Sequence, residues 1–181
     1  MNKKKVLGIV GSPRRGANTE TIIDQVLKGS EESGALTEKI VLSEMIVKSC
    51  RACNACQRTG KCIIEDDFAS IYEKMKESSV WVIGTPVYWW GPTSQMKAFI
   101  DRWYGVDRAI FRGKEIILAV SSNGGPSYAR LTVDMLELII PYLGMRQVAT
   151  LQAAGTTGPD YVKNNAGLME KALRTGRDVV K

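Results

Sequence analysis

The amino-acid sequence predicts a doubly wound α/β fold, in which helices cover both faces of a five-stranded parallel sheet and form three layers. Short, almost fully apolar runs recur along the chain, as is typical of strands buried on both faces. Segments with apolar residues at helical spacing alternate with these runs. The segments that follow several of the runs are rich in Gly, Pro, Ser and Thr, which are typical of loops.

Five strands are expected along the chain. Four apolar runs predict buried strands, and a weaker run predicts a fifth. They cover residues 5–10, 40–42 with the residues just before them, 80–84, 116–120 and, for the weaker run, 147–151.

Helices are expected between these strands, each two to three turns long. A last, more polar helix is expected from about residue 160 to 177. The apolar positions at helical spacing are Ile22, Ile23, Val26 and Leu27; Phe68, Ile71, Tyr72 and Met75; Met96, Phe99, Ile100 and Trp103; and Leu131, Met135, Leu138, Ile139 and Tyr142.

The length of 181 residues favours a single domain over residues 1–181, with an insertion at about 46–67 after the second strand. In a doubly wound sheet, ligands bind beyond the carboxyl ends of the strands, where the strand order reverses. The candidate ligand loops are therefore 11–18, 85–93 and 121–127.

Composition excludes several classes of function. The chain has no histidine, which excludes catalytic triads that use His and zinc sites that use His. A net charge of +6 favours acidic partners, but the charge is too diffuse to indicate nucleic-acid binding. No apolar run approaches the roughly 20 residues that cross a bilayer, and no leader pattern opens the chain, so we expect a cytoplasmic protein without a membrane partner.

The loop after the first strand has the features of a phosphate site. Backbone N–H groups converge there at the start of a helix, and Arg14 adds a positive charge. An ATP-binding P-loop would need Lys and Ser or Thr where Ala17 and Asn18 stand, and Gly8 and Gly11 lack the dinucleotide spacing. With these two excluded, the phosphate of a mononucleotide is the ligand that the loop favours. The alternative is a tight turn with Asn18 or Thr19 as a helix cap.

The run Gly-Ser-Pro-Arg-Arg-Gly-Ala-Asn-Thr, residues 11–19, resembles the FMN-phosphate loop of the NAD(P)H-dependent FMN reductase group of the flavodoxin-like superfamily. The resemblance implies the strand order 2-1-3-4-5 and FMN as cofactor. It also implies that the phosphate is held by Ser12, Arg14, Asn18 and Thr19.

An aromatic triplet lies between two prolines in the loop after the third strand, and this segment can offer a flavin ring an apolar face and backbone hydrogen bonds. The alternative is that these aromatic residues pack into the core or an oligomer interface. The segment resembles the Thr-Pro-x-Tyr loop of the same family. The residues expected at the ring are Pro86, Val87, Tyr88, Trp89, Trp90 and Gly91, with Ser122, Gly124 and Gly125 of the next loop on its other side.

Four cysteines fall within residues 50–62: Cys50, Cys53, Cys56 and Cys62. Their spacing favours a 4Fe-4S cluster, because successive Cys-x-x-Cys steps are typical of ferredoxin cluster loops, while zinc, a disulfide or an empty loop remain alternatives. This insertion resembles the iron-sulfur flavoproteins, a branch of the FMN reductase group, and the resemblance covers roughly residues 4–155. Asp66 and Asp67 are expected to cap the next helix.

These features predict an FMN-dependent oxidoreductase that passes electrons between FMN, a 4Fe-4S cluster and a redox partner. The resemblance implies a small acidic ferredoxin as that partner, consistent with the positive net charge, or NAD(P)H as co-substrate. The alternatives are a cluster-free NAD(P)H-dependent reductase of FMN, quinones or nitro compounds, and a non-enzymatic flavodoxin-like carrier. No side chain is assigned as catalytic, and we expect a homodimer or homotetramer.

Overall fold

The computed structural model describes residues 3–181, and all five of its strands lie in one parallel sheet. The sheet has the order β2-β1-β3-β4-β5, which confirms the predicted flavodoxin-like topology. The order reverses between β1 and β3, so a crevice is expected beyond the carboxyl ends of these two strands. The strands are β1 (Lys5–Val10), β2 (Leu36–Val41), β3 (Val80–Pro86), β4 (Glu115–Ser121) and β5 (Arg146–Ala153).

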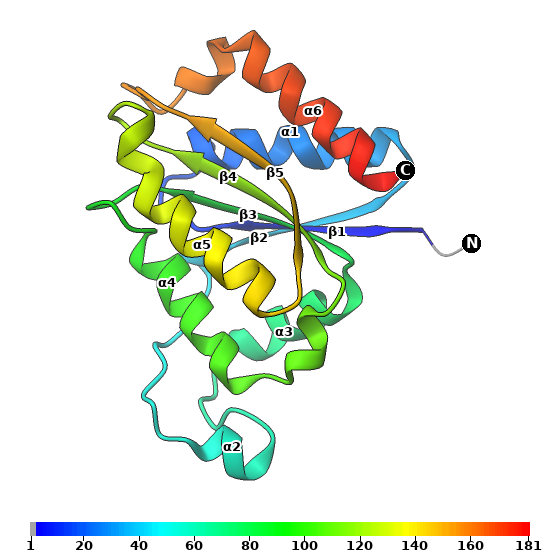
Figure 1. The fold of residues 1–181 in the computed structure, drawn as a ribbon, viewed down its shortest axis with the longest axis vertical. Helices are drawn as coiled ribbons and strands as arrows, with labels where there is room; N and C mark the ends of the chain where they lie inside the picture. The colour runs from blue at the N-terminus through cyan, green and yellow to red at the C-terminus, as the bar shows by residue number, and fades with distance from the viewer. Residues whose placement is uncertain (1–2) are drawn as a thin grey trace.

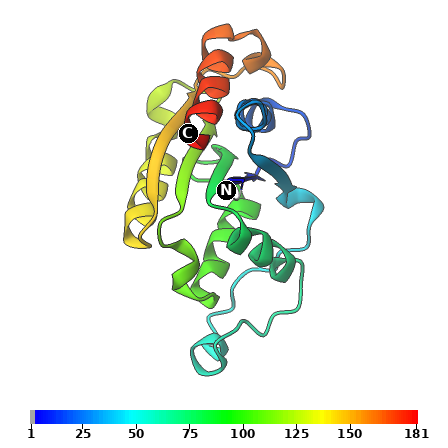
Figure 2. The ribbon, with the colours of Figure 1, turned by 90° about the vertical axis from the view of Figure 1, so that its right-hand side faces the viewer.

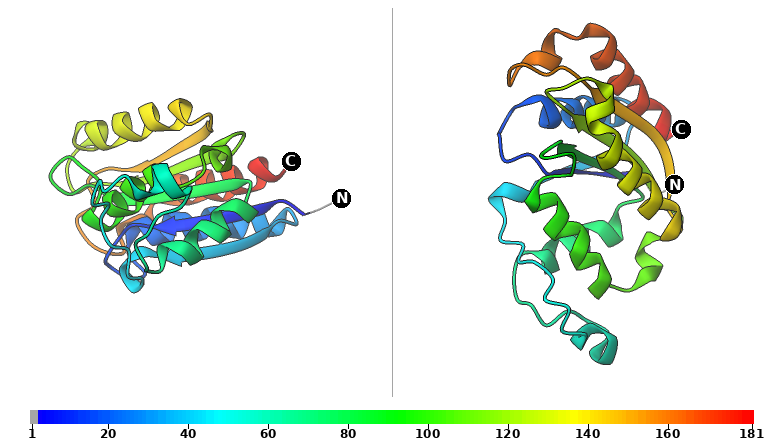
Figure 3. Two further views of the ribbon diagram at one scale, coloured as in Figure 1. Left: turned by 90° about the horizontal axis from the view of Figure 1, so that it is seen from below. Right: turned by 60° about the vertical axis from the view of Figure 1, so that its left-hand side comes forward.

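Helices cover both faces of the sheet, as Figures 1 and 2 show. One face carries α1 (Asn18–Glu32) and α6 (Ala166–Val180). The opposite face carries α3 (Phe68–Glu77), α4 (Ser94–Asp101) and α5 (Arg130–Tyr142). The short helix α2 (Ala55–Thr59) lies in the insertion, which projects away from the sheet (Figure 3, right).

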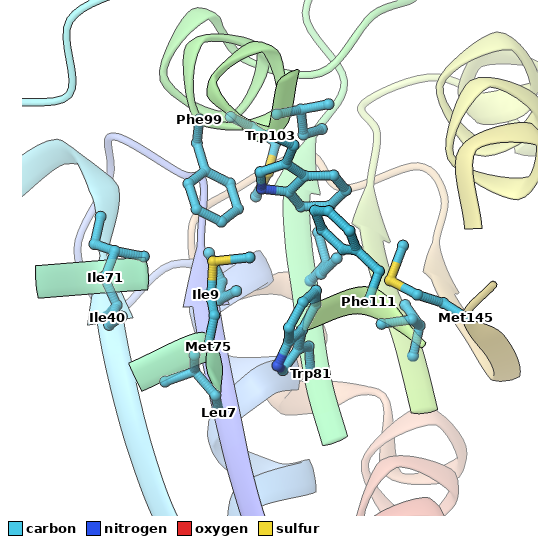
Figure 4. Packing of buried hydrophobic residues seen from close by; sticks show 14 of the residues in the cluster. Leu7, Ile9, Ile40, Ile71, Met75, Trp81, Phe99, Trp103, Phe111 and Met145 are labelled. Atoms are coloured by element: carbon cyan, nitrogen blue, oxygen red, sulfur yellow. The ribbon is translucent and has the colours of Figure 1, made fainter. Parts of the chain in front are cut away.

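Each face of the sheet has its own hydrophobic core, because neighbouring strand residues point to opposite sides. In β1, Val6 and Val10 pack toward α1 and α6, whereas Leu7 and Ile9 pack toward α3 and α4. The core on the side of α3 and α4 is built around aromatic rings, which Figure 4 shows. The ring of Trp103 lies 5.4 Å from that of Phe99 and 5.4 Å from that of Phe111, and Trp81 meets Phe111 edge-on at 5.9 Å. Tilted and edge-on pairs of this kind are favourable beyond the area that they bury.

Helices α1 and α6 pack backbone against backbone. A Cβ atom at Gly29 would lie 2.0 Å from the carbonyl oxygen of Leu173, and one at Gly176 would lie 2.0 Å from that of Val26. Ser30 Oγ donates a hydrogen bond to the carbonyl oxygen of Gly176 at 3.1 Å. Glycine is therefore required at both positions for this close approach.

The structure corrects two boundaries. The last helix begins at Ala166 rather than near residue 160, because residues 161–164 form a 3₁₀ turn and Asn165 Oδ1 caps the helix by accepting from the amide of Leu168 at 3.0 Å. Strand β2 ends at Val41, since Leu42 opens another 3₁₀ turn. Within residues 3–181, no helix has the length and apolar character that would let it cross a membrane.

Candidate functional site

A cleft lies beyond the carboxyl ends of the strands, where the switch in strand order predicts one. Its volume is about 260 Å³. A second pocket of about 360 Å³ adjoins it and shares three lining residues, Val87, Ser122 and Asn123. The first is lined by residues of the loops after β1, β3, β4 and β5; the second is lined by residues after β3 and β4 and by Trp89, Trp90 and Tyr128.

The loop after β1 is folded by its own side chains. Ser12 Oγ accepts a hydrogen bond from the amide of Arg14 at 3.1 Å, which tightens the turn. Further along, Gly16 adopts a left-handed φ of 62°, and its amide donates to Glu20 Oε2 at 2.7 Å. The loop is thus fixed at two points, and Ser12 and Arg14 both line the cleft.

Glu20 is a buried carboxylate beneath this loop, with 2% of its surface exposed. Burial acts to raise its pKa, but hydrogen bonds from Lys39, the Gly16 amide and Arg15 outweigh that effect and lower the pKa to about 2. Arg15 also reaches the carboxylate of Glu44. The two cations therefore hold the loop through an ionised Glu20.

The start of α1 faces the cleft without a side-chain cap, because the N-cap residue is Ala17. The expected alternative of Asn18 or Thr19 as the cap is therefore wrong. Asn18 Nδ2 donates to the carbonyl oxygen of Gly158 at 2.7 Å, and its Oδ1 accepts from the amide of Val162 at 3.0 Å. Thr19 Oγ1 lies 2.8 Å from Ser121 Oγ. Both side chains tie the walls of the cleft together, which leaves the first-turn amides of α1 as the groups available to an anion.

The aromatic loop after β3 turns through two residues with left-handed backbone, Trp89 (φ 51°) and Trp90 (φ 62°). Tyr88 and Gly91 pair across the turn, with amide-to-carbonyl distances of 2.8 and 3.0 Å. Asn-Gly is the usual choice for such a turn, and bulky residues there are strained. Trp89 is 92% exposed, so the alternative that it packs into the core is wrong.

Trp90 forms one wall of the second pocket. Its ring stacks on Tyr128, with centroids 6.1 Å apart and planes 20° from parallel, and its carbonyl oxygen accepts from Thr132 Oγ1 at 2.9 Å. Gly124 lies under Tyr128, because a Cβ atom there would come within 2.4 Å of the ring. The glycine therefore makes room for an aromatic side chain of the wall.

Most of the predicted flavin residues line one of the two pockets, including Pro86, Val87 and Tyr88 in the first. Gly91 and Gly125 line neither pocket. Sequence reasoning missed the segment Thr156 to Pro159 after β5, together with Asn123 and Tyr128. The composition Thr-Thr-Gly-Pro after a strand carried the same loop signal as the others.

The four cysteines line one small pocket of about 20 Å³ in the insertion. All four are free thiols, with Cys50 and Cys53 exposed and Cys56 and Cys62 half-buried. Left-handed backbone at Ala52 (φ 51°) and Asn54 (φ 55°) shapes the loop around them. In the part of the chain that the structure describes, no three Cys, His, Asp or Glu side chains are arranged to hold a metal ion.

A buried ion pair anchors the insertion to the fold. Arg102 Nη1 lies 2.5 Å from Asp66 Oδ2, and their side chains are 1% and 0% exposed. Burial acts to raise the pKa of Asp66, but the hydrogen bonds from Arg102 and the amide of Lys48 outweigh it and lower this pKa. Arg102 also donates to the carbonyl oxygen of Lys48 at 3.0 Å.

The expected capping of α3 is confirmed for Asp66 and is wrong for Asp67. Asp66 Oδ1 does accept from the amide of Phe68 at 3.2 Å, at the start of α3. Asp67, however, makes no side-chain cap and instead accepts from the amide of Ile46 at 2.7 Å. The reason is that the two ends of the insertion meet here, so both carboxylates bind backbone across the junction.

Arg102 also faces the thiols. It lines the cysteine pocket, and its buried Nε has no hydrogen-bond partner within residues 3–181. A buried donor without an acceptor is costly, so an acceptor in this pocket would stabilise the structure. Four thiolates and an unpartnered buried donor fit a bound cluster whose sulfur atoms accept hydrogen bonds.

The strand order, the cleft at the carboxyl ends of the strands and the aromatic loop together define a flavodoxin-like flavoprotein of the oxidoreductase class. The chain belongs to the NADPH-dependent FMN reductase family, whose family model matches residues 4–160.

Comparison with relatives identifies the branch of the family that the chain resembles. An iron-sulfur flavoprotein of Methanocaldococcus jannaschii is 38% identical over 183 aligned residues, which cover 97% of this chain and 95% of the relative. Another, from Methanosarcina thermophila, is 39% identical over 121 residues, or 67% of this chain and 63% of that protein. The predicted likeness to the iron-sulfur flavoprotein branch is therefore confirmed.

Solved structures support the fold. The NAD(P)H:quinone oxidoreductase from Methanothermobacter marburgensis superposes with a TM-score of 0.77 at 18% identity, covering 99% of this chain and 98% of that one. An FMN-dependent NADH-azoreductase from Bacillus anthracis, solved in complex with FMN, gives a TM-score of 0.70 at 15% identity, covering 99% and 100%. At these identities the likeness shows the fold alone.

Proposed function

We propose that the chain binds FMN in the cleft and a 4Fe-4S cluster at the four cysteines, and passes electrons between them and a redox partner. The observation that carries the proposal is the pairing of an open cleft at the strand-order switch with one pocket lined by all four thiols. Bound FMN supplies one- and two-electron chemistry, and a cluster supplies one-electron transfer.

The chain's own groups would position the cofactors. The first-turn amides of α1 and the guanidinium of Arg14 would meet the FMN phosphate, and Ser12 would orient the loop. The aromatic wall of Trp90 and Tyr128 would lie at the flavin ring. Cys50, Cys53, Cys56 and Cys62 would ligate the cluster, with Arg102 Nε donating to one of its sulfur atoms.

Quantitation of FMN, iron, zinc and sulfide on protein purified without oxygen tests this assignment. We expect FMN together with four irons and acid-labile sulfide per chain, and a broad iron-sulfur shoulder beneath the flavin bands. A pure flavin spectrum without iron would remove the cluster, and zinc in place of iron would make the insertion a structural metal site.

Variants separate the two cofactors. Cys56→Ser should lose iron and keep FMN, since Cys56 lies in the insertion and lines neither part of the cleft. Ser12→Ala and Asn18→Ala should weaken FMN retention about tenfold, because each loses a hydrogen bond that shapes the cleft. Ser94→Ala, an exposed hydroxyl outside both pockets, is the control. FMN affinity equal to that of the control in both cleft variants would contradict the phosphate site.

Four exposed cations surround the thiols and favour an acidic electron-transfer protein such as a ferredoxin as partner: Lys48, Arg51, Arg58 and Lys61. Opposite charges accelerate encounter, and salt screens the effect. Electron transfer from an acidic ferredoxin should therefore slow as salt is raised, and Arg58→Glu should flatten that dependence. A rate independent of salt in the unmodified protein would contradict this partner.

A second function is a cluster-free, NAD(P)H-dependent reduction of FMN, quinones or nitro compounds. The family supports it, because the model that matches residues 4–160 is that of an NADPH-dependent FMN reductase. Steady-state oxidation of NADPH by the Cys56→Ser variant discriminates: turnover equal to that of the unmodified protein supports this function, and loss of turnover together with iron supports the cluster.

A further inference from the structure

The cysteine pocket has an outer side and an inner side. Two of its four thiols are exposed, whereas Cys56 and Cys62 are half-buried. These two lie against the 3₁₀ turn Arg102–Gly105, which continues α4. A Cβ atom at Gly105 would lie 3.3 Å from the Cβ atom of Cys62 and 3.7 Å from that of Cys56. The body of the protein therefore supplies the inner wall of the pocket through this turn.

The guanidinium of Arg102 is held from several sides in this wall. Its Nη1 donates to the carbonyl oxygen of Lys48 at 3.0 Å and to Asp66 Oδ2 at 2.5 Å, and its Nη2 donates to the carbonyl oxygen of Ile64 at 3.4 Å. Its Cζ lies 4.6 Å from the centre of the Phe68 ring. Within residues 3–181, the buried Nε has no partner. Because these contacts fix the group, Nε cannot turn toward another acceptor without breaking them.

The same guanidinium is close to a thiol. Burial acts to lower the pKa of Arg102, but Asp66 and, less strongly, the thiol of Cys62 raise it. Arg102 and Asp66 are 1% and 0% exposed, so salt screens their charges far less than those of the exposed cations around the pocket. One buried positive charge and one buried negative charge therefore lie at the inner side of the cysteine pocket.

We infer that Arg102 and Asp66 set the reduction potential of the cluster in opposite directions, an inference that rests on the proposed function. Hydrogen bonds to the sulfur atoms and nearby charge determine how readily a cluster accepts an electron. Arg102 raises the potential by donating from Nε to a sulfur atom on the Cys62 side. Asp66 lowers it, because a buried carboxylate opposes added negative charge. Neither residue ligates the cluster; both act on it through charge and hydrogen bonding.

Redox titration with dithionite, followed by electron paramagnetic resonance, tests the two signs on protein purified without oxygen. Arg102→Lys keeps a positive charge opposite Asp66 but has no counterpart of Nε, so the potential should fall. Asp66→Asn removes the negative charge and keeps the donor, so the potential should rise. We expect each change to alter the ratio of reduced to oxidised cluster at least tenfold, which is about 59 mV for a one-electron couple.

Two controls accompany these variants. Asp101→Asn also removes a negative charge beside Arg102, but this carboxylate pairs with Lys97 on the exposed side of the segment. Its effect on the cluster should be small, because water and salt screen an exposed charge. The potential of the bound FMN should stay unchanged in every variant, since neither Arg102 nor Asp66 lines the cleft.

A pair that serves only as a tether gives a different result. Both variants would then lose iron or stability together, and the potential of any cluster that remains would not move in opposite directions. That result, or potentials equal to that of the unmodified protein, would overturn the inference. If Arg102→Lys alone loses iron, the sign of the shift in Asp66→Asn decides. Failure of the proposed function is distinct, because the unmodified protein would then hold no iron.

Discussion

The cleft and the cysteine insertion are two candidate sites built in opposite ways. The cleft is walled by loops that leave buried strands, and its residues Ser12, Thr19 and Ser122 are themselves buried. The insertion has one short helix, α2, and exposes Cys50 and Cys53. A site made by the core is preorganised before it meets a ligand, whereas a loop with few apolar contacts depends on a tether to the rest of the fold.

The largest effect is expected from breaking the tether of the insertion. Arg102→Met removes one partner of a fully buried ion pair and leaves Asp66 as an unpaired buried carboxylate. We expect a loss of about 3–5 kcal/mol in the free energy of unfolding, measured with urea. The loss of iron binding should accompany it.

Lys97→Met is the matched control, because Lys97 pairs with Asp101 on the exposed side of the same segment. An exposed i,i+4 pair contributes only about 0.3–0.5 kcal/mol. Similar changes in the two variants would show that the buried pair is not the anchor.

The next effect concerns Glu20, the buried carboxylate that holds the loop after β1. Because the pKa of Glu20 is lowered from 4.5 to about 2, its ionised form contributes stability that is complete above pH 4.5 and is lost as the pH falls toward 2. The unmodified protein should lose about 3 kcal/mol from this group across that range. Glu20→Gln should be less stable at neutral pH and should lack this part of the pH dependence.

Urea unfolding at several pH values measures how the free energy of unfolding depends on pH. Glu44→Gln, which alters the exposed partner of Arg15, should keep the pH dependence of the unmodified protein. If Glu20→Gln keeps it as well, other carboxylates carry the acid sensitivity.

The smallest effect concerns strain at the mouth of the cleft. Replacing Trp89 by Asn and Trp90 by Gly supplies the residues that this turn prefers, so the variant should gain about 1 kcal/mol of stability. It should also bind FMN more weakly, because the stack of Trp90 on Tyr128 is lost. Thermal unfolding and flavin titration measure the two effects. Greater stability with unchanged FMN affinity would separate the strained turn from flavin binding.

The fold was predictable because its signals are local. Apolar runs such as residues 80–84 and 116–120 marked strands that the structure confirms, and their alternation with helices required a parallel sheet. The start of the last helix was less predictable, since a 3₁₀ turn and the cap at Asn165 share the polar composition of the helix itself.

The candidate sites were predictable as segments but not as side-chain contacts. The sequence located the phosphate loop, yet gave no sign that Asn18 would bond to a loop 140 residues away. The pairing of Arg102 with Asp66 depends on where the insertion rejoins the fold. The spacing of residues in the sequence does not reveal that position. Residue types predict chemistry, whereas the partners of long-range hydrogen bonds are set by the tertiary structure.

The close packing of α1 on α6 also bears on the order in which the protein folds during synthesis. Residues 166–180 follow every strand of the sheet, so the ribosome releases them after the α3, α4 and α5 side has been made. Until then, Val26 and Ile22 of α1 and the sheet behind them lack the cover of α6. The part of this face that α6 covers therefore stays exposed until late in synthesis, and its closure depends on two glycines, Gly29 and Gly176, that let the helix backbones meet without side chains.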